Sequence, residues 1–239
     1  MKLCIDNGNT RTKMAIFDND KLVDYGVFFH ILYSNVAKMP DFLQDICGDN
    51  ALNIKALVEK KDGVNYLGGV YGFHDNIGGD LLAMAVYAHQ IFPNTAKLVV
   101  SLGTCITYEL ILADGKFVGG AISPGIRMRA ISLHHCTDAL PIVNVDTQQA
   151  ASWHKYSPNT ENAITKGIID GATGELQYHI KHFRDDFPEG KVFLTGGDAE
   201  FFAPQVDAEV INDMVLKGLS LLPDGGSAAV SGTNNKIVF

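Results

Sequence analysis

Two stretches of the sequence repeat one pattern: an apolar run, a polar turn centred on glycine, and a second run rich in β-forming residues. The first stretch is LCIDNGNTRTKMAIF at residues 3–17, and the second is LVVSLGTCITYELIL at residues 98–112. Asp6 ends the first apolar run, whereas Ser101 takes the matching place in the second. A pattern that returns after roughly ninety residues exceeds the solenoid range and favours a duplicated, two-lobed α/β protein.

The segments around both stretches have similar periodicity. Short β-prone runs predict strands at residues 2–6, 13–17, 21–29, 97–101, 105–113, 116–123 and 191–195. Helical patterns cover residues 78–92, 123–137 and 160–183, and we expect Ser123 to cap the second of these helices. We therefore predict an N-terminal lobe at 1–95, a C-terminal lobe at 96–222, and a flexible tail at 223–239, where Gly, Ser and Asn are frequent.

Composition excludes several classes of protein. The 239 residues are 46% hydrophobic and 19% charged, which is typical of a globular protein. The formal net charge of −8 argues against a nucleic-acid surface. The longest apolar stretch is too short and too polar to span a membrane, and Asp6 interrupts any N-terminal signal sequence, so we expect a cytoplasmic protein.

The first turn, DNGNT, has the residues of a phosphate site. Gly8 lets the backbone approach a ligand, and Asn9 and Thr10 supply hydrogen-bond donors. Asp6 could hold a hydrated Mg²⁺, and Lys13 could face an anion. An ordinary Asn-Gly hairpin is the alternative. Two further glycine turns after apolar strands, in SLGT and LTGGDA, favour a nucleotide held between two lobes.

Several motifs together resemble one enzyme family. DNGNT at 6–10, GGD at 78–80, SLGTCIT at 101–107, GGAISPG at 119–125 and LTGGDA at 194–199 are similar, in order and spacing, to type III pantothenate kinases. The resemblance extends to about residue 220 and is specific when the motifs are taken together. It implies two ribonuclease H-like lobes of the acetate and sugar kinase, Hsp70 and actin superfamily, with the active site in the cleft between them.

The same resemblance implies an activity and its cofactors. The family phosphorylates pantothenate with ATP, in the first step towards coenzyme A. It acts as a homodimer, with the substrate site near the subunit interface. It also uses a divalent metal, expected here to be Mg²⁺, and a monovalent cation such as K⁺ or NH₄⁺.

The resemblance further assigns roles near the substrate. Asp80 matches the catalytic carboxylate, although a helix-start residue favoured by the helix dipole is an alternative interpretation. Leu81 takes the place of an Arg of the family, so we expect weaker pantothenate binding. Tyr71 matches a substrate-contacting Tyr, with a core aromatic as the alternative, and Thr160 matches a Thr that contacts pantothenate, with a helix cap as the alternative. The expected substrate-binding residues are Tyr71, Gly78, Gly79, Asp80, Leu81 and Thr160.

The nucleotide and the cations are expected at the glycine turns. Gly196, Gly197 and Asp198 should lie near the nucleotide, with a strand-to-helix turn as the alternative. Ser101 occupies the position of the Asp that coordinates the monovalent cation in the family, so we expect this site to be weak or absent. Glu109, eight residues further on, is expected not to replace that carboxylate. The expected ATP-binding residues are Asp6, Asn7, Gly8, Asn9, Thr10, Arg11, Thr12, Lys13 and Thr104.

Two other functions remain open at this point. Leu81 and Ser101 favour a degenerate relative that binds nucleotide without turnover, whereas the presence of Asp6, Asp80 and Thr104 opposes it. A kinase with a different small-molecule acceptor is the third hypothesis. The residues His134, His135, Cys136 and His154 lack the spacing of a zinc motif, so we do not expect them to form a metal site.

Overall fold

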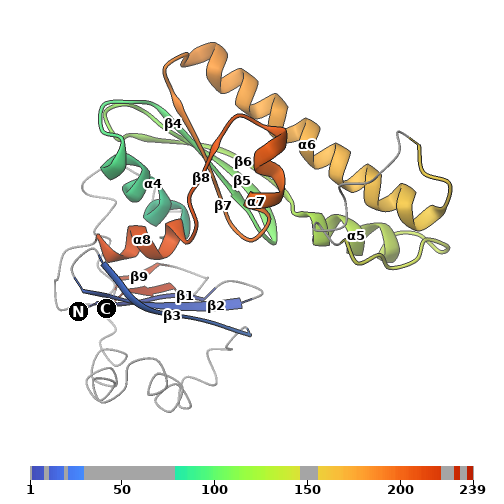
Figure 1. The fold of residues 1–239 in the computed structure, drawn as a ribbon, viewed down its shortest axis with the longest axis horizontal. Coiled ribbons are helices and arrows are strands. Elements are labelled where there is room, and N and C mark those ends of the chain that lie inside the picture. Colours follow the sequence, from blue (N-terminus) through green and yellow to red (C-terminus); the bar gives the residue numbers. More distant parts are fainter. Residues whose placement is uncertain are drawn as a thin grey trace. The chain divides into compact units, whose positions relative to one another are not determined.

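Two five-stranded sheets organise the part of the chain described by the computed structural model, which comprises residues 2–7, 11–18, 21–29, 79–145, 156–221, 229–231 and 236–238. The strand orders are β3-β2-β1-β10-β9 in the first sheet and β6-β5-β4-β7-β8 in the second. The chain divides into two compact units, each containing one sheet (Figure 1). This mixed α/β architecture confirms the predicted fold class, and its duplicated meanders explain the sequence repeat.

The first sheet begins with the predicted meander. Its strands are β1 (Lys2–Asn7), β2 (Arg11–Asp18), β3 (Lys21–Phe29), β9 (Ala229–Ser231) and β10 (Lys236–Val238). Strands β1, β2 and β3 pair antiparallel, with Cys4 opposite Ala15 and Asp6 opposite Lys13. Because opposite residues share a face, the apolar Cys4–Ala15 pair and the charged Asp6–Lys13 pair lie along one face.

Two helices pack on that face of the first sheet. They are α4 (Gly79–Ile91) and α8 (Met214–Ser220). The buried side chains of this packing come from both strands and both helices: Cys4, Ala15, Phe17, Ala83, Leu216 and Leu219. Gly218 permits the close approach of the helices, because a Cβ at this position would lie 1.9 Å from the Ala83 carbonyl oxygen. Helix α4 confirms the helix predicted at 78–92.

The second sheet has a similar meander at its centre. Strand β4 pairs antiparallel with β5 and parallel with β7, and β7 pairs parallel with β8. The strands are β4 (Lys97–Leu102), β5 (Cys105–Ile111), β6 (Phe117–Pro124), β7 (Lys191–Thr195) and β8 (Glu209–Val210). The predicted strands of this region are therefore confirmed, with boundaries that move by one or two residues.

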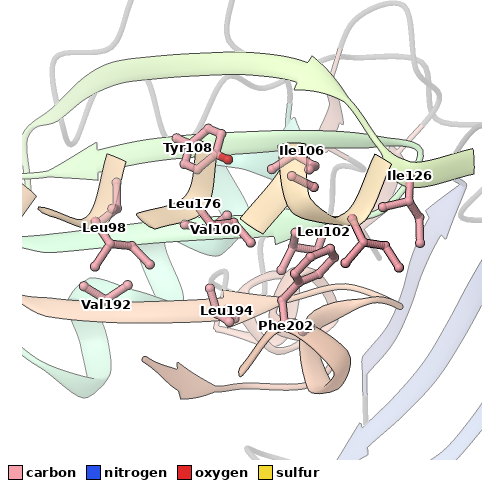
Figure 2. Close-up of a cluster of buried hydrophobic side chains, with 14 of the residues drawn as sticks. Leu98, Val100, Leu102, Ile106, Tyr108, Ile126, Leu176, Val192, Leu194 and Phe202 are labelled. Carbon is pink, nitrogen blue, oxygen red and sulfur yellow. The ribbon is translucent and has the colours of Figure 1, made fainter. Parts of the chain in front are cut away.

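One face of the second sheet forms the larger core. Alternate residues of β4 and β7 point at helix α6 (Thr160–Asp186), which buries Leu176 and Ile180 against them. Figure 2 shows Leu98, Val100 and Leu102 beside Leu176, with Val192 and Leu194 below them. The remaining helical segments of this unit are α5 (Ile126–His135), α7 (Ala199–Phe202) and the short 3₁₀ turn η4 (Ala203–Gln205). Among the described residues, no helix is long and apolar enough to cross a membrane.

The C-terminal part of the chain differs from the sequence-based division. One unit comprises Met1–Pro93, Gly115–Phe117 and Asp213–Phe239, and the other comprises Asn94–Asp114 and Val118–Asn212. Residues 213–220 therefore belong with the first unit, because α8 packs on α4 and β1. In the stretch expected to be a flexible tail, strand β10 pairs with β1, placing Val238 opposite Cys4, and β9 pairs with β10. Local composition could not indicate this pairing, because the partner strand lies at the other end of the chain.

The Gly218 contact generates a test of stability. We expect Gly218→Ala to lower the free energy of unfolding by about 1–3 kcal/mol, as overpacking does, because its methyl group meets backbone atoms of α4. The matched control is Gly174→Ala in α6, where a Cβ meets nothing within 4 Å. At a protein concentration low enough to keep the chain monomeric, that substitution should be neutral or stabilising by about 0.5–1 kcal/mol. Urea denaturation measures both, and equal effects would contradict the packing argument.

Candidate functional site

The charged end of the first sheet contains two of the predicted nucleotide residues. Asp6 lies one residue before the end of β1, and Lys13 lies directly opposite it on β2. Both side chains are half-buried. The register therefore brings a carboxylate and an ammonium group together near the end of β1.

Two residues that the sequence analysis missed complete this end of the sheet. Lys13 Nζ donates to Asp213 Oδ1 at 2.9 Å, and the hydroxyl of Tyr25 donates to the same oxygen at 3.1 Å. Burial, and then the charge of Asp213, raise the pKa of Tyr25 to about 12. Tyr25 is therefore a neutral donor at physiological pH. Asp213 is 200 residues from Lys13 in the sequence, so no local pattern could have indicated the pair.

Other predicted residues of the first unit are only partly described. Gly8, Asn9, Thr10, Tyr71 and Gly78 lie outside the described residues. Asn7 and Thr12 lie in strands β1 and β2, and Arg11 begins β2 with an exposed side chain. Gly79, Asp80 and Leu81 form the first turn of α4, where Asp80 and Leu81 are half-buried. The structure thus brings Asp80 to a helix N-terminus, where the helix dipole favours its negative charge.

Three glycine-containing segments meet in the second unit, and two of them, SLGT and LTGGDA, contain glycine turns predicted from the sequence. The exposed residues Gly103 and Thr104 form the turn between β4 and β5. The Gly125 N–H donates to the Thr104 carbonyl oxygen at 3.0 Å, and the Asp198 N–H donates to the Leu102 carbonyl oxygen at 3.2 Å. The segments SLGT, SPG and TGGD are thus hydrogen-bonded neighbours.

Glycine is required at two of these contacts. A Cβ on Gly125 would lie 2.0 Å from the Gly103 carbonyl oxygen, and one on Gly196 would lie 2.2 Å from the Leu102 carbonyl oxygen. Gly196 also has φ +100°, a conformation that other residues rarely adopt. The residue after Gly125 begins α5, so unpaired helix N–H groups lie next to the Gly103–Thr104 turn. Such donors suit a phosphate group.

Ser101 lies on a polar face of the second sheet. It is half-buried and pairs with Thr107 on β5 and with Thr195 on β7. Glu109, which is 2% exposed, pairs with Val99. Because Val99 and Ser101 point the same way, Glu109 is a diagonal neighbour of Ser101, within reach of a long side chain. The separation of eight residues was therefore a wrong reason to discount Glu109 as a replacement for the carboxylate missing at Ser101. The antiparallel turn between β4 and β5 brings Glu109 back beside Ser101.

A half-buried polar network supports the turn that contains Gly125. Glu175 of α6 accepts hydrogen bonds from the Ser123 hydroxyl, from Arg129, and from the Tyr108 hydroxyl at 3.0 Å. Arg129 also donates through Nε to the Pro124 carbonyl oxygen at 2.7 Å. The prediction that Ser123 caps α5 is therefore wrong, because the Ser123 hydroxyl is directed to Glu175.

The network also determines two pKa values. Burial raises the pKa of the Glu175 carboxyl, but the hydrogen bonds from Ser123, Arg129 and Tyr108 outweigh burial, and its pKa lies below the ordinary 4.5. Burial, followed by the charge of Glu175, raises the pKa of Tyr108 far above its usual value. Tyr108 and Glu175 are thus a neutral donor and an ionised acceptor at physiological pH.

The remaining predicted residues lie on helices of the second unit. Thr160 is the first residue of α6 and is exposed, but Asn159 caps the helix by accepting from the Asn162 N–H at 2.9 Å. The capping interpretation of Thr160 is therefore wrong. His134 Nδ1 lies 2.8 Å from the Leu140 carbonyl oxygen. Within the described parts of the chain, no group of three or more His, Cys, Asp or Glu side chains is arranged to hold a metal ion.

Comparisons with known proteins agree with the motifs. The sequence model of the type III pantothenate kinase family matches residues 27–182. A type III pantothenate kinase of Flavobacterium johnsoniae is 31% identical over 92% of this chain and 96% of its own length. The chain belongs to the type III pantothenate kinase family.

Solved structures show the fold of this family member independently. A Campylobacter jejuni protein described as a Baf family transcriptional activator has a TM-score of 0.55 at 21% identity, covering 91% of this chain and 94% of its own. A Listeria monocytogenes protein described as an N-acetylmannosamine kinase has a TM-score of 0.50 at 14% identity, covering 91% and 97%. At these identities the likeness concerns the fold alone, and the second agrees with the predicted two-lobed kinase fold.

The depressed pKa of Glu175 generates a prediction for this family member. A carboxyl whose pKa is lowered on folding stabilises the protein above its unfolded pKa, and that contribution is lost as pH falls through the folded value. We therefore expect the urea concentration at the unfolding midpoint to decrease as the pH is lowered below about 4.5. This decrease should be steeper for the parent than for Glu175→Gln. At pH 7 the variant should be less stable by about 2 kcal/mol.

The control is Asp185→Asn, which breaks an exposed ion pair with Lys181 on the same helix. Its stability should change by less than about 1 kcal/mol at either pH. Parallel pH profiles for the parent and Glu175→Gln would contradict the assignment of the network.

Proposed function

We propose that this chain transfers the γ-phosphoryl group of ATP to pantothenate, giving 4′-phosphopantothenate in the first step towards coenzyme A. Membership of the type III pantothenate kinase family over most of the chain is the observation that supports this most directly. Phosphoryl transfer needs carboxylates and backbone donors of the kind found at Asp6, at Asp80 and in the Gly103–Thr104 turn. Asp6 lies near the end of β1, Asp80 lies in the first turn of α4, and the turn follows β4.

Asp80 is the proposed catalytic residue. Its carboxylate would orient the primary hydroxyl of pantothenate and accept the hydroxyl proton as the phosphoryl group transfers. Asp80 lies in the first turn of α4, the end of a helix at which acidic side chains are favoured. Tyr71 and Thr160 are proposed to contact pantothenate, together with the GGD segment at 78–80.

The nucleotide phosphates are proposed to bind at the glycine turns. The absence of side chains at Gly125 and Gly196 leaves the backbone of the Gly103–Thr104 turn close to a helix N-terminus, a donor set that fits phosphate oxygens. On the first unit, Lys13 is proposed to face a phosphate group of the nucleotide. Asp6 would hold a hydrated Mg²⁺, which neutralises charge on the phosphates when bound.

We further propose a cytoplasmic homodimer. One face of α6 is exposed and contains the small residues Ala163, Gly167, Gly171 and Gly174. A Cβ at Gly167 or Gly174 meets nothing within 4 Å in one chain, and Tyr178 on this helix is 59% exposed. This face leaves room for a second copy to approach closely.

One observation favours a second function, a kinase with another acceptor. Leu81 follows Asp80 in the first turn of α4 and is half-buried. A leucine cannot form the charge-assisted hydrogen bonds that an arginine at this position makes. An acceptor with an apolar group in place of an anionic one would suit this position better.

Replacement of Asp80 tests the proposed function. We expect Asp80→Asn to lower kcat about 10²- to 10⁴-fold, because the general base is lost, while the KM for ATP changes little. The measurement is coupled ADP release with and without pantothenate. Asp185→Asn, an exposed aspartate on α6, should keep parental rates. Near-parental turnover by Asp80→Asn would remove Asp80 from the mechanism. ADP release by the parent with another alcohol but not with pantothenate would favour a different acceptor.

We also propose that the monovalent cation site near Ser101 is weak, and a K⁺ titration tests this. A carboxylate 4 Å from a monovalent cation attracts it by about 4 kcal/mol at an effective dielectric of 20, before ion desolvation is subtracted. Ser101 cannot supply this attraction, because its hydroxyl is neutral. We expect the parent to be nearly insensitive to K⁺ against Na⁺, and Ser101→Asp to gain K⁺ activation. Activity and thermal melting are measured across a K⁺ titration.

The position of Glu109 provides the control for this titration. If the parent is strongly activated and stabilised by K⁺, the weak-site proposal is wrong. Loss of that response in Glu109→Gln would then identify Glu109 as the replacement carboxylate.

A further inference from the structure

We infer that Asp213 is a positioning residue that holds the Lys13 ammonium group in place for the nucleotide phosphates. The inference rests on the proposed function, because it assumes that Lys13 faces those phosphates. The pair joins segments 200 residues apart, with Lys13 Nζ 2.9 Å from Asp213 Oδ1. Side chains of both residues are about 30% exposed, so a phosphate can still approach the ammonium group.

The side chain of Asp213 is directed at Lys13 and not at its own helix. Asp213 has φ 55° and ψ 35°, the left-handed conformation that is uncommon outside glycine. It also precedes α8 as the N-cap residue, yet its side chain makes no capping hydrogen bond. An aspartate at this position ordinarily accepts from a backbone N–H of the first helical turn. Here the same carboxylate accepts from Lys13 and from the Tyr25 hydroxyl.

The carboxylate of Asp213 is anchored by the core of the first unit. Helix α8 begins at the next residue, and its side chains Leu216 and Leu219 are buried against the sheet. Gly218 brings α8 into backbone contact with Ala83 of α4. Asp213 therefore has a fixed position relative to helix α4, whose first turn contains Asp80. The proposed catalytic base and the phosphate-facing lysine are thus positioned by the same packed helices.

Lys13 has a second carboxylate nearby, that of Asp6, and Asp213 competes with it for the ammonium group. Asp6 is directly opposite Lys13 in the β1–β2 register, where opposed side chains lie about 4.5–5.5 Å apart at Cβ. A lysine has four rotatable side-chain bonds, so without Asp213 the ammonium group can turn to the Asp6 carboxylate. That carboxylate is the proposed holder of hydrated Mg²⁺. Removal of Asp213 should therefore disturb both the phosphate contact and the use of Mg²⁺.

Two substitutions separate the charge of Asp213 from its backbone. Asp213→Asn keeps the shape and tolerates the left-handed conformation, whereas Asp213→Gly relieves the conformation and removes both contacts. We expect both variants to raise the KM for ATP about three- to tenfold, the range for one partly exposed charge-assisted contact. Both should also need more Mg²⁺ for half-maximal rate. The KM for pantothenate should stay parental, and Asp213→Asn should keep the parental melting temperature. The control is Asp185→Asn, whose exposed carboxylate pairs with Lys181.

A double-mutant cycle tests whether Asp213 acts through Lys13. In a Lys13→Met background, Asp213→Asn should have no further effect on the KM for ATP, because the residue that it positions is absent. Parental ATP and Mg²⁺ dependence in both Asp213 variants would overturn the inference, as would additive effects in the cycle.

Direct binding distinguishes this inference from the proposed function. Calorimetry with Mg²⁺-ADP on the parent, Asp213→Asn and Lys13→Met requires no turnover and no pantothenate. A parent that binds Mg²⁺-ADP but does not phosphorylate pantothenate defeats the proposed function, while weaker binding by Asp213→Asn still supports the inference. A parent that binds no Mg²⁺-ADP overturns the inference, because Lys13 then faces no phosphate.

Discussion

Close approach of backbone to backbone at glycine is the constraint on which both units depend. In the second unit, Gly125 and Gly196 bring their segments against the Leu102–Thr104 turn, and any side chain at either position would overlap a carbonyl oxygen. In the first unit, Gly218 brings α8 against Ala83 of α4. Contact at this distance positions polar backbone groups without intervening side chains. The candidate phosphate donors and the helix that contains Asp80 are therefore placed by backbone packing.

The polar groups near these contacts are arranged in two networks of different character. Around Glu175, three donors converge on one half-buried carboxylate and tie β5, β6 and α5 to α6. Around Asp213, one carboxylate accepts from a lysine and a tyrosine at the exposed end of the first sheet. Both oxygens of the Glu175 carboxylate accept from these donors, which suits a structural role. Lys13 is partly exposed and can meet a ligand as well, which suits a role in binding.

The local sequence was sufficient to predict the strands of both meanders, helices α4 and α6, and two glycine turns of the second unit, in SLGT and LTGGDA. Each of these features depends on periodicity or on a glycine requirement that neighbouring residues express. The motif resemblance added the proposed roles of Asp80 and of the nucleotide-binding residues. Local reasoning was wrong for the Ser123 cap, because the Ser123 hydroxyl donates to a tertiary partner, Glu175. It was also wrong for the alternative of a Thr160 cap, because Asn159 caps α6.

What the sequence by itself determined is the identity of the elements and the family, because apolar period, turn residues and motif order are properties of the chain alone. Only the tertiary structure decided which elements share a sheet or a site. It paired β10 with β1, joined Asp213 to Lys13, and folded Glu109 back beside Ser101. The physical reason is that strand register and helix packing bring together side chains far apart in the chain, and no local pattern records such pairs.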